Sequence, residues 1–432
     1  MITSTHHLLY GKTGMELRLP GDAAVLEGKP IPALPDADAA IRAALAAPIG
    51  SKPLAELLRE RRPGTVAITI SDVTRPVPNA IFLPHLLRTL NDCGIPDGRV
   101  VIIVGTGMHR HSTPVELEAL VGPEIRARVE VVDHNAHDAA SLVCIREQPP
   151  VSVCRRFAEA EFRIVTGFIE PHFMAGFSGG RKGVCPALVD LATVQRFHGF
   201  ETLADSRARE GNLEGNPCHA IALDIARAVG VDFLFNVALA RDRKIAAVCC
   251  GDLEAAHAHG CAQVAEWTTA AAGGPYDLVV TNGGGFPLDQ TFYQTVKGMV
   301  TALPALSAGS TLLVAAHCGE GLGSRAYAEL MLHYANDWRA FLRDAGASRD
   351  HTKLDQWQYQ MQCRTLAMTG VERLRFVSDG IPLETQRRLS VTPVEGAGDA
   401  RERAQRFLDD FLRDHPGARV AVIPDGPYVM LT

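Results

Sequence analysis

Short apolar, β-rich runs alternate with helical stretches along this chain, and this alternation limits its fold more than any other feature. In the first half the runs are Val66–Ile70, Arg99–Val104, Val129–Val132 and Arg163–Val165, and a helical stretch at Asn79–Cys93 separates the first two. Runs that are apolar throughout are buried on both faces when helices cover a sheet on both sides. The pattern therefore predicts a parallel sheet between two helical layers.

A second set of such runs begins near Tyr276. It comprises Asp277–Val280, Thr311–Ala315, Arg375–Val377 and Arg419–Ile423, with long helical stretches at Ala326–Asp344 and His351–Met368. A chain of 432 residues is too long for one ordinary domain. We therefore expect the α/β class, with two α/β domains, mainly parallel sheets and an active-site cleft between the domains. The expected boundaries are 1–270 for an N-terminal domain, 271–275 for a hinge, 276–423 for a C-terminal domain and 424–432 for a tail that returns to the N-terminal domain.

Composition restricts the class of protein. Hydrophobic residues make up 47% of the chain and charged residues 21%, which is the balance of a globular protein with a substantial core. The net charge of −6 gives no basic surface for nucleic acid or membrane, and no apolar run reaches the roughly 18 residues of a spanning helix. The chain start lacks a signal-peptide pattern, and no C-x-x-C pair occurs. We therefore expect reduced thiols and a cytoplasmic protein.

Polar clusters follow the strands of the first set. In doubly wound sheets, ligands bind outside the carboxyl ends of the strands. After Val66–Ile70 come Asp72, Thr74 and Arg75, in a loop that two prolines stiffen. Arg75 can bind a carboxylate through two hydrogen bonds; alternatively, Asp72 and Arg75 form an ion pair that only supports a turn.

The next strand, Arg99–Val104, is followed by Gly105, Thr106 and Gly107, then by His109 and a helix start with capping-box spacing. Free backbone N–H groups beside a helix N-terminus predict an anion site. His109 can exchange protons near neutral pH. An ordinary turn is the alternative, since a lone G-x-G pattern is weak.

The segment 167–186 is the most distinctive of the chain. Its glycines let the backbone approach a ligand closely, and it carries His172 and Lys182, with His198 further along. It is not a Walker A loop, because Gly183 rather than serine or threonine follows the lysine. A structural glycine-rich loop with a surface lysine is the alternative.

The second half contributes Tyr293, Gln294 and Lys297 on a predicted helix after a triple glycine. Tyr293 and Lys297 would share one face of this helix. Trp357 lies among polar residues, where a tryptophan is either a cleft wall or a domain-packing residue. For the helix, the alternative is an amphipathic surface element without a role in binding.

Taken together, these motifs resemble the nickel-dependent lactate racemase family. They are, in order, SDVTRPVP, GTGMHRHSTPVEL, GFIEPHFMAGFSGGRKGVCP, the later His198, GNLEGNP and DQTFYQTVKG, and they run from about Asp72 to Trp357 with family-like spacing. The resemblance implies two α/β domains, the N-terminal one binding the cofactor. It also implies a racemase or epimerase of a small, lactate-like 2-hydroxy acid. The implied cofactor is the nickel-pincer nucleotide, a pyridinium-3-thioamide-5-thiocarboxylic acid mononucleotide that holds Ni.

The resemblance assigns a role to each matched residue. Lys182 would tether the cofactor through a thioamide, His198 would be the nickel ligand, and His109 and His172 would be the two acid/base residues. The other cofactor contacts would come from Asp72, Thr74, Gly105, Thr106, Gly107, Ser178, Gly179 and Gly180. The substrate contacts would come from Arg75, Tyr293, Gln294, Lys297 and Trp357.

The implied chemistry explains why these residue types are needed. The α-hydrogen beside an ionised carboxylate is poorly acidic, whereas its removal as hydride gives a planar 2-keto acid that can be reduced again on either face. The cofactor carries the hydride, and the protein orients the substrate and moves the hydroxyl proton. One histidine would serve each enantiomer.

Two other classes of function are alternatives to the racemase. They are a phosphate- or nucleotide-binding transferase that uses the Lys182 loop, and a non-catalytic binder. The expected partners are a small-molecule 2-hydroxy acid and the cofactor-synthesis proteins needed for maturation, with no nucleic acid and no membrane. The choice of acid and the formation of a homo-oligomer stay open.

Overall fold

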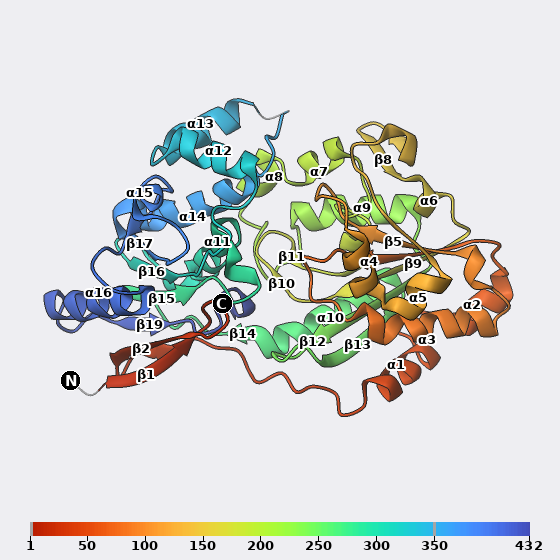
Figure 1. The fold of residues 1–432 in the computed structure, drawn as a ribbon, viewed down its shortest axis with the longest axis horizontal. Helices are drawn as coiled ribbons and strands as arrows, with labels where there is room; N and C mark the ends of the chain where they lie inside the picture. Colours follow the sequence, from red (N-terminus) through yellow and green to blue (C-terminus); the bar gives the residue numbers. More distant parts are fainter. Residues whose placement is uncertain (1–2, 349–350) are drawn as a thin grey trace. The chain divides into compact units, whose positions relative to one another are not determined.

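The computed structural model describes residues 3–348 and 351–432, and the chain separates into two compact units. The N-terminal unit comprises residues 30–198 and 207–267. The C-terminal unit comprises residues 1–29, 199–206 and 268–432. Each unit is built around its own six-stranded sheet, and the elements are labelled in Figure 1.

The sheet of the N-terminal unit has the order β13-β12-β9-β4-β5-β6. In that order the strands span Ile245–Gly251, Phe233–Leu239, Phe162–Phe168, Val66–Ser71, Val100–Gly105 and Glu130–Asp133. β13 is antiparallel to β12, and the other neighbours are parallel. The chain runs from β4 out to β6 and returns to β9 on the other side of β4. The strand order therefore reverses between β4 and β9, and ligands of doubly wound sheets bind at the carboxyl ends of such a pair.

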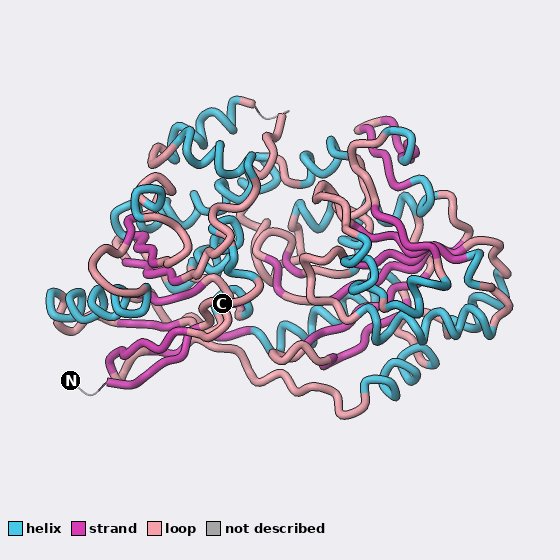
Figure 2. Tube along the Cα trace, in the orientation of Figure 1, coloured by secondary structure: helices cyan, strands magenta, loops and turns pink. Residues whose placement is uncertain are grey.

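Helices cover both faces of this sheet, as the alternation of cyan helices and magenta strands in Figure 2 shows. Residues Val66, Ile68 and Ile70 of β4 join a core cluster with residues of the helices on one face. These helices are α1 (Ala37–Ala46), α2 (Leu54–Arg61), α3 (Asn79–Asp92), α4 (Pro114–Val121) and α5 (Pro123–Arg128). The other face carries α9 (Pro217–Val229), α10 (Leu253–Thr268) and the 3-10 helix η3 (Gly180–Gly183).

The sheet of the C-terminal unit is entirely parallel, with the order β18-β17-β16-β15-β19-β3. In that order the strands span Thr392–Pro393, Leu374–Val377, Thr311–Ala315, Leu278–Asn282, Val420–Val422 and Ala24–Val25. Helices α11 (Phe292–Thr301) and α14 (Gln356–Arg373) pack on one face. On the other face, α16 (Ala400–Asp414) lies beside the hairpin of β1 (Thr3–Leu8) and β2 (Met15–Pro20), as Figure 1 shows.

Shorter elements complete the chain. In the N-terminal unit they are η1 (Asp97–Arg99), η2 (Ala139–Ser141), β7 (Leu142–Glu147), β8 (Pro150–Cys154), α6 (Arg155–Ala158), β10 (Pro171–His172), β11 (Gly176–Phe177) and α7 (Leu191–Phe197). In the C-terminal unit they are α8 (Phe200–Ala204), β14 (Thr269–Ala270), η4 (Leu288–Gln290), η5 (Leu303–Ala305), α12 (Arg325–Tyr334), α13 (Trp338–Ala347), α15 (Leu383–Gln386), η6 (Gly426–Tyr428) and β20 (Met430–Leu431).

The expected α/β class with mainly parallel sheets is confirmed, but the structure places the domain boundaries differently. Residues 1–29 do not belong to the N-terminal unit, because β3 extends the C-terminal sheet by pairing with β19. Residues 199–206 also join the C-terminal unit, where the carbonyl of Phe200 accepts a hydrogen bond of 2.7 Å from Gln360. The tail does not return to the N-terminal unit, since β20 pairs with β14 inside the C-terminal one.

Two predicted helices also differ from the structure. The stretch Ala326–Asp344 forms two helices, α12 and α13, because Ala335 adopts a φ of 48° that ends the first one. The helix predicted from His351 begins at Gln356. All ten cysteines are free thiols. Among the described residues, no helix is long and apolar enough to cross a membrane.

Candidate functional site

Asp72 and His109 meet at the carboxyl ends of β4 and β5. Nδ1 of His109 lies 2.6 Å from Oδ2 of Asp72, and Nδ1 is the donor because a carboxylate only accepts. Thr74 donates its hydroxyl to the other carboxylate oxygen at 2.6 Å. The hydrogen bonds of the carboxylate therefore go to His109 and Thr74, and the guanidinium of Arg75 contributes its charge.

Asp72 is ionised at neutral pH. Only 6% of the residue is exposed, and this burial raises the pKa of its carboxyl. The hydrogen bond and charge of His109, the charge of Arg75 and the hydroxyl of Thr74 outweigh burial and hold the pKa below its usual value. A buried carboxylate that is fixed by two partners can hold an imidazole in one orientation.

In the turn after β5, backbone N–H groups donate hydrogen bonds to carbonyl groups of the protein itself. Thr106 donates its N–H to the carbonyl of Val104, and Gly107 donates to the carbonyl of Ala187, both at 2.9 Å. At the start of α4 the predicted capping box is present, formed by Thr113 and Glu116. These donors are satisfied internally, so the hydrogen bonds of this turn do not support the expectation that Gly105, Thr106 and Gly107 bind an anion.

The glycine-rich segment turns sharply before η3. Gly179 and Gly180 have φ values of 72° and 55°, which favour glycine. The N–H of Gly180 donates to Oδ1 of Asn236 at 2.7 Å. A Cβ on Gly180 would lie 2.5 Å from the ring of His257. Only glycine fits there without a shift, and the turn it permits places Lys182 in η3.

Buried side chains hold the shape of this segment. The guanidinium of Arg181 is 1% exposed and donates to the carbonyls of Ala175 at 2.6 Å and Phe177 at 2.9 Å. The hydroxyl of Ser178 donates to the carbonyl of Phe168 at 2.9 Å and accepts the N–H of Glu170 at 2.9 Å. Ser178, predicted to contact the cofactor, is therefore engaged in the hydrogen bonding of its own loop.

Lys182 and His198 both lie near the ring of Phe197. Nζ of Lys182 is 5.9 Å from the centroid of the Phe197 ring, and the ring of His198 meets the same ring edge-on at 4.6 Å between centroids. Nδ1 of His198 donates to the carbonyl of Val194 at 2.9 Å. Burial, together with the nearby charge of Lys182, lowers the pKa of His198 to about 3.

These features fit a metal-ligating histidine. A neutral imidazole whose Nδ1–H is held by a carbonyl presents the lone pair of Nε2, which is the arrangement that metal-binding histidines use. Within residues 3–348 and 351–432, no three His, Cys, Asp or Glu side chains cluster in a way that could hold a metal by themselves. A metal on His198 would therefore need its other donors from a bound cofactor.

His172 lies in β10, directly after the end of β9, and its ring is fixed by the turn that follows. Its Nδ1 accepts the backbone N–H groups of Met174 at 3.3 Å and Ala175 at 3.2 Å. The turn closes where β10 pairs with β11. The N-terminal unit thus contains all the predicted residues from Asp72 to His198.

The C-terminal unit brings together the remaining predicted residues. The hydroxyl of Tyr293 accepts a hydrogen bond of 2.8 Å from Nε1 of Trp357, so α11 and α14 present these two side chains together. Lys297 lies one turn after Tyr293 on α11. Among the described side chains, Gln294 has a buried Oε1 without a hydrogen-bond partner, which is an acceptor suited to a ligand.

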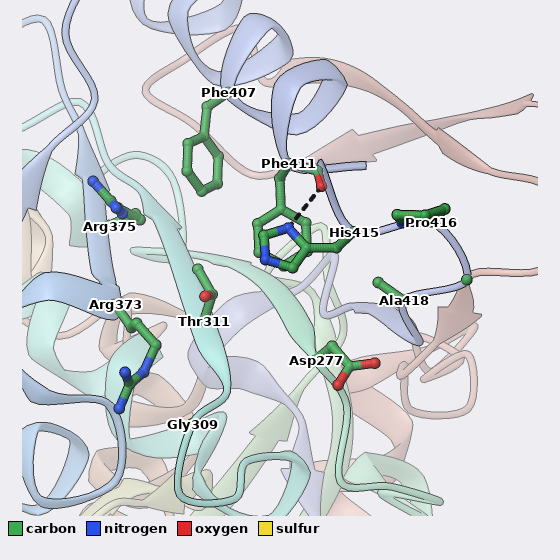
Figure 3. Close-up of a pocket in the computed structure, with 11 residues that line it drawn as sticks. Asp277, Gly309, Thr311, Arg373, Arg375, Phe407, Phe411, His415, Pro416 and Ala418 are labelled. Atoms are coloured by element: carbon green, nitrogen blue, oxygen red, sulfur yellow. Dashed lines mark hydrogen bonds between the residues drawn. The ribbon is translucent and has the colours of Figure 1, made fainter. Parts of the chain in front are cut away.

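A surface groove of about 560 Å³ lies at the amino-terminal ends of strands in the C-terminal sheet. It is formed where β15, β16 and β17 begin, by residues that include Asp277, Thr311 and Arg375. Figure 3 shows Arg373 and Arg375 on one side and Phe411 and His415 on the other. The groove contains none of the predicted site residues. It lies at the amino-terminal ends of the strands, whereas doubly wound sheets bind ligands at the carboxyl ends.

Sequence reasoning missed the residues that support the glycine-rich segment. Asn236 is fully buried in β12 and accepts the N–H of Gly180. Asn216 donates to the carbonyl of Met174 at 2.9 Å, and Nη1 of Arg181 in η3 lies 3.1 Å from Nε2 of His257. A polar residue inside the apolar run Phe233–Leu239 was the sequence signal for Asn236. Asn216 and His257 reach the segment from elements that are distant in sequence, and such contacts leave no signal in the sequence.

Comparison with known proteins identifies the family of this chain. Residues 10–211 match the lactate racemase N-terminal domain family, and residues 272–431 match the lactate racemase C-terminal domain family. The chain belongs to the lactate racemase family. The lactate racemase of Lactiplantibacillus plantarum is 37% identical over 383 residues, which cover 88% of this chain and 87% of that protein. The lactate racemase of Thermoanaerobacterium thermosaccharolyticum is 32% identical over 90% of this chain and 89% of that protein.

Solved structures show the same lactate racemase fold. The lactate racemase apoprotein from T. thermosaccharolyticum superimposes with a TM-score of 0.90 at 30% identity, covering 99% of this chain and 100% of that structure. A protein from Thermotoga maritima matches with a TM-score of 0.67 at 17% identity over 94% of this chain. The second match shows the fold alone.

Proposed function

We propose that this protein is an isomerase that inverts C2 of a small, lactate-like 2-hydroxy acid, using a nickel-pincer nucleotide tethered to Lys182. The family membership and the two lactate racemase relatives support racemase activity. The arrangement of Lys182, Phe197 and His198 carries the more specific proposal. It combines a lysine for the tether with a neutral histidine whose Nδ1 hydrogen bond to Val194 presents Nε2 as a metal ligand.

The cofactor, when bound, supplies an acceptor for the C2 hydrogen of the substrate as hydride. The protein's own residues do the rest of the work. In this proposal His109 and His172 act on the hydroxyl proton, and Asp72 and Thr74 hold His109. Arg75 in the N-terminal unit and Lys297 in the C-terminal unit are the cations for the substrate carboxylate, since each offers charge-assisted hydrogen bonds.

In the C-terminal unit, the proposal assigns substrate contacts to Tyr293, Gln294 and Trp357. The hydrogen bond from Trp357 holds the Tyr293 hydroxyl in place on α11. The buried Oε1 of Gln294 has no partner within the described chain. A substrate hydroxyl that donated to it would remove the cost of an unpaired buried acceptor.

The proposal is tested by loading the cofactor and following optical purity. The protein is co-expressed with cofactor-synthesis proteins, and enantiopure 2-hydroxy acids of varied size and charge are then assayed by chiral chromatography. We expect an intact-mass increase located on Lys182 and loss of optical purity for one acid. Lys182→Ala should show neither, while Lys244→Ala, which changes an exposed lysine whose side chain is 73% accessible, should show both.

Each other outcome has a defined meaning. A mass increase without racemisation would keep the cofactor assignment and place the substrate outside the panel. Racemisation by an unmodified Lys182→Ala protein would disprove the tether. Neither adduct nor racemisation in the wild-type chain would reject the proposal and favour the phosphate-binding transferase.

A further inference from the structure

We infer that the groove at the amino-terminal ends of β15, β16 and β17 is a second binding site, which takes a small aromatic carboxylate. The groove lies entirely within the C-terminal unit and contains none of the residues assigned to racemisation. The site is therefore independent of the proposed function. The volume of the groove, about 560 Å³, falls in the range of small-molecule sites.

Arg375 is a charged residue on a face of the sheet that is mainly apolar. Side chains of a strand alternate between the two faces, so Arg375 and Val377 of β17 point to the same side. Val377 belongs to the core cluster that includes Leu408 of α16. Arg375 therefore extends from β17 beneath α16, where its guanidinium carbon lies 5.6 Å from the centroid of the Phe407 ring.

The cation of Arg375 has no anionic partner in the part of the chain that the structure describes. Its Nε atom is buried and lacks a hydrogen-bond partner there. Within residues 3–348 and 351–432, neither Arg375 nor the neighbouring Arg373 forms an ion pair. Burial lowers the pKa of the Arg375 guanidinium, because water is partly removed from the charged form. A partly buried cation of this kind favours an anionic ligand, whose charge and hydrogen bonds offset the lost hydration.

The charges that line the groove favour a ligand with a single negative charge. Arg373 and Arg375 supply two positive charges, and Asp277 supplies a negative one. Oδ2 of Asp277 accepts the backbone N–H of Arg419 at 2.8 Å, which holds this carboxylate directly before β15. A ligand carboxylate balances the remaining positive charge and can accept two hydrogen bonds from one guanidinium. A phosphate dianion would be repelled more strongly by Asp277.

The acidic residues beside the groove are already paired. A neighbouring hollow of about 380 Å³ joins the groove at Arg375. Of the carboxylates in this hollow, Glu395 lies 2.8 Å from Arg387, and Asp410 lies 2.8 Å from Arg413. These carboxylates therefore do not replace the ligand as partners of Arg375.

Phe411 and His415 form the side of the groove opposite the two arginines (Figure 3). Their rings stack with 4.3 Å between centroids, and Nδ1 of His415 donates to the carbonyl of Phe411 at 3.0 Å. Phe407 and Phe411 are only partly buried, so both present apolar ring surface to a flat ligand. The negative end of the α16 dipole lies at this side. The ligand carboxylate therefore belongs at the arginines, and its ring belongs beneath the last turn of α16.

Benzoate is the simplest probe of this chemistry. The full-length, cofactor-free protein is titrated with benzoate while the carbon-bound ring protons of His415 are followed by NMR, with assignment by their loss in His415→Asn. We expect saturable shifts with an affinity in the millimolar range, since a ligand of this size makes few contacts. Benzyl alcohol, which has the ring but no charge, should bind at least about tenfold more weakly.

Arginine variants test which charge the ligand needs. Arg375→Gln should weaken benzoate binding about tenfold or more, because it removes the unpaired cation. Arg373→Gln changes an exposed residue, should leave the fold intact and should also weaken binding. Arg339→Gln is the matched control. Arg339 is exposed and also lies over an aromatic ring, that of Trp338 at 4.2 Å, but on α13 and outside the groove. It should leave the affinity unchanged.

The groove must also be distinguished from the proposed racemase site, whose cations can bind a carboxylate too. Lys297→Gln should leave the benzoate-induced shifts of His415 and their midpoint unchanged. Loss of these shifts in Lys297→Gln would refute the groove as the place of binding. Failure of the proposed racemase function would not affect the result, since the titration needs neither cofactor nor turnover.

Three further results would overturn the inference. The first is the absence of saturable shifts at His415 in the wild-type protein. The second is an unchanged benzoate affinity in both Arg373→Gln and Arg375→Gln. The third is tighter binding of inorganic phosphate than of benzoate at His415, which would mean that the groove binds anions without regard to the aromatic ring.

Discussion

At the residue scale, His134 links two of the loops that surround the candidate site. Its ring is 2% exposed, and Nε2 lies 3.0 Å from the carbonyl of Val189 in the segment after η3. Its own carbonyl accepts the hydroxyl of Thr106 at 2.6 Å. Burial lowers the pKa of His134 to about 4. The neutral ring is therefore part of the folded state.

His134 should make the stability of the protein depend on pH in a defined window. His134 binds a proton near pH 6.5 in the unfolded chain but only near pH 4 in the folded chain. Between these two values the unfolded state binds more protons, so unfolding becomes more favourable as the pH falls from 6.5 to 4. The contribution is fully present above pH 6.5 and is worth roughly 3 kcal/mol, since one pKa unit corresponds to about 1.4 kcal/mol. Urea unfolding between pH 4 and 7 measures it.

The control for this effect is His134→Gln, which can still donate to Val189 but does not titrate. Its unfolding free energy should vary less steeply with pH between pH 4 and 6.5, because unfolding then takes up about one proton fewer. An identical slope in both proteins would contradict the assignment and point to the other buried histidines, His219 and His257, whose pKa values burial also lowers, to about 4 and about 3.

At the element scale, the glycine-rich segment shows how local backbone and tertiary packing act together. The left-handed turn at Gly179 and Gly180 is a local property of glycine. The space for that turn is set by Asn236 from β12 and His257 from α10, which lie against it. The position of Lys182 in η3 thus depends on two elements that are distant in sequence.

Substitution of Gly180 should therefore disturb the fold and the cofactor tether together. Gly180→Ala combines a φ of 55° with a Cβ 2.5 Å from the His257 ring. We expect a loss of about 1–3 kcal/mol in unfolding free energy and a smaller fraction of protein with cofactor on Lys182, measured by urea unfolding and intact mass.

Gly98→Ala is the matched control for Gly180→Ala. Gly98 lies in η1, has no neighbour within 4 Å of a built Cβ and does not need a left-handed φ. Gly98→Ala should change the unfolding free energy by no more than about 0.5 kcal/mol and should leave cofactor loading unchanged. Equal losses in both variants would mean that glycine content, rather than the turn, is responsible.

At the scale of the whole molecule, the first residues of the chain complete the core of the last domain. Leu8, Leu17 and Leu19 of the β1–β2 hairpin are fully buried in one cluster with Leu408 of α16. The backbone of Arg18 exchanges hydrogen bonds of 2.8 Å and 3.1 Å with the side chain of Gln405. Chain ends that are far apart in sequence therefore fold as one unit.

Leu17→Ala should destabilise the C-terminal unit. Removal of a fully buried leucine side chain costs about 2–5 kcal/mol through lost burial and the cavity that remains. Arg18→Ala, at the next and exposed position, keeps the backbone bonds to Gln405 and should cost less than about 0.5 kcal/mol. Proteolysis of folded protein followed by mass mapping should show increased cleavage in β1, β2 and α16 for Leu17→Ala alone.

The sequence by itself determined the local structure and the chemistry of the protein. Continuous apolar runs gave β4, β5, β15 and β16, because parallel strands are buried on both faces. The Thr113–Glu116 spacing gave the capping box of α4, because both of its hydrogen bonds lie within four residues. The long motifs identified the lactate racemase family, which the comparisons confirm.

Only the tertiary structure decided which segments belong together and what each polar atom does. It moved residues 1–29 and 199–206 into the C-terminal unit, because strand addition and buried contacts between distant segments leave no periodic trace in the sequence. The tertiary structure also forms the hydrogen bond between His109 and Asp72, and it places Nδ1 of His172 next to two backbone N–H groups. The tautomer of a histidine is set by the atoms around its ring, and those atoms are in place only when the chain has folded.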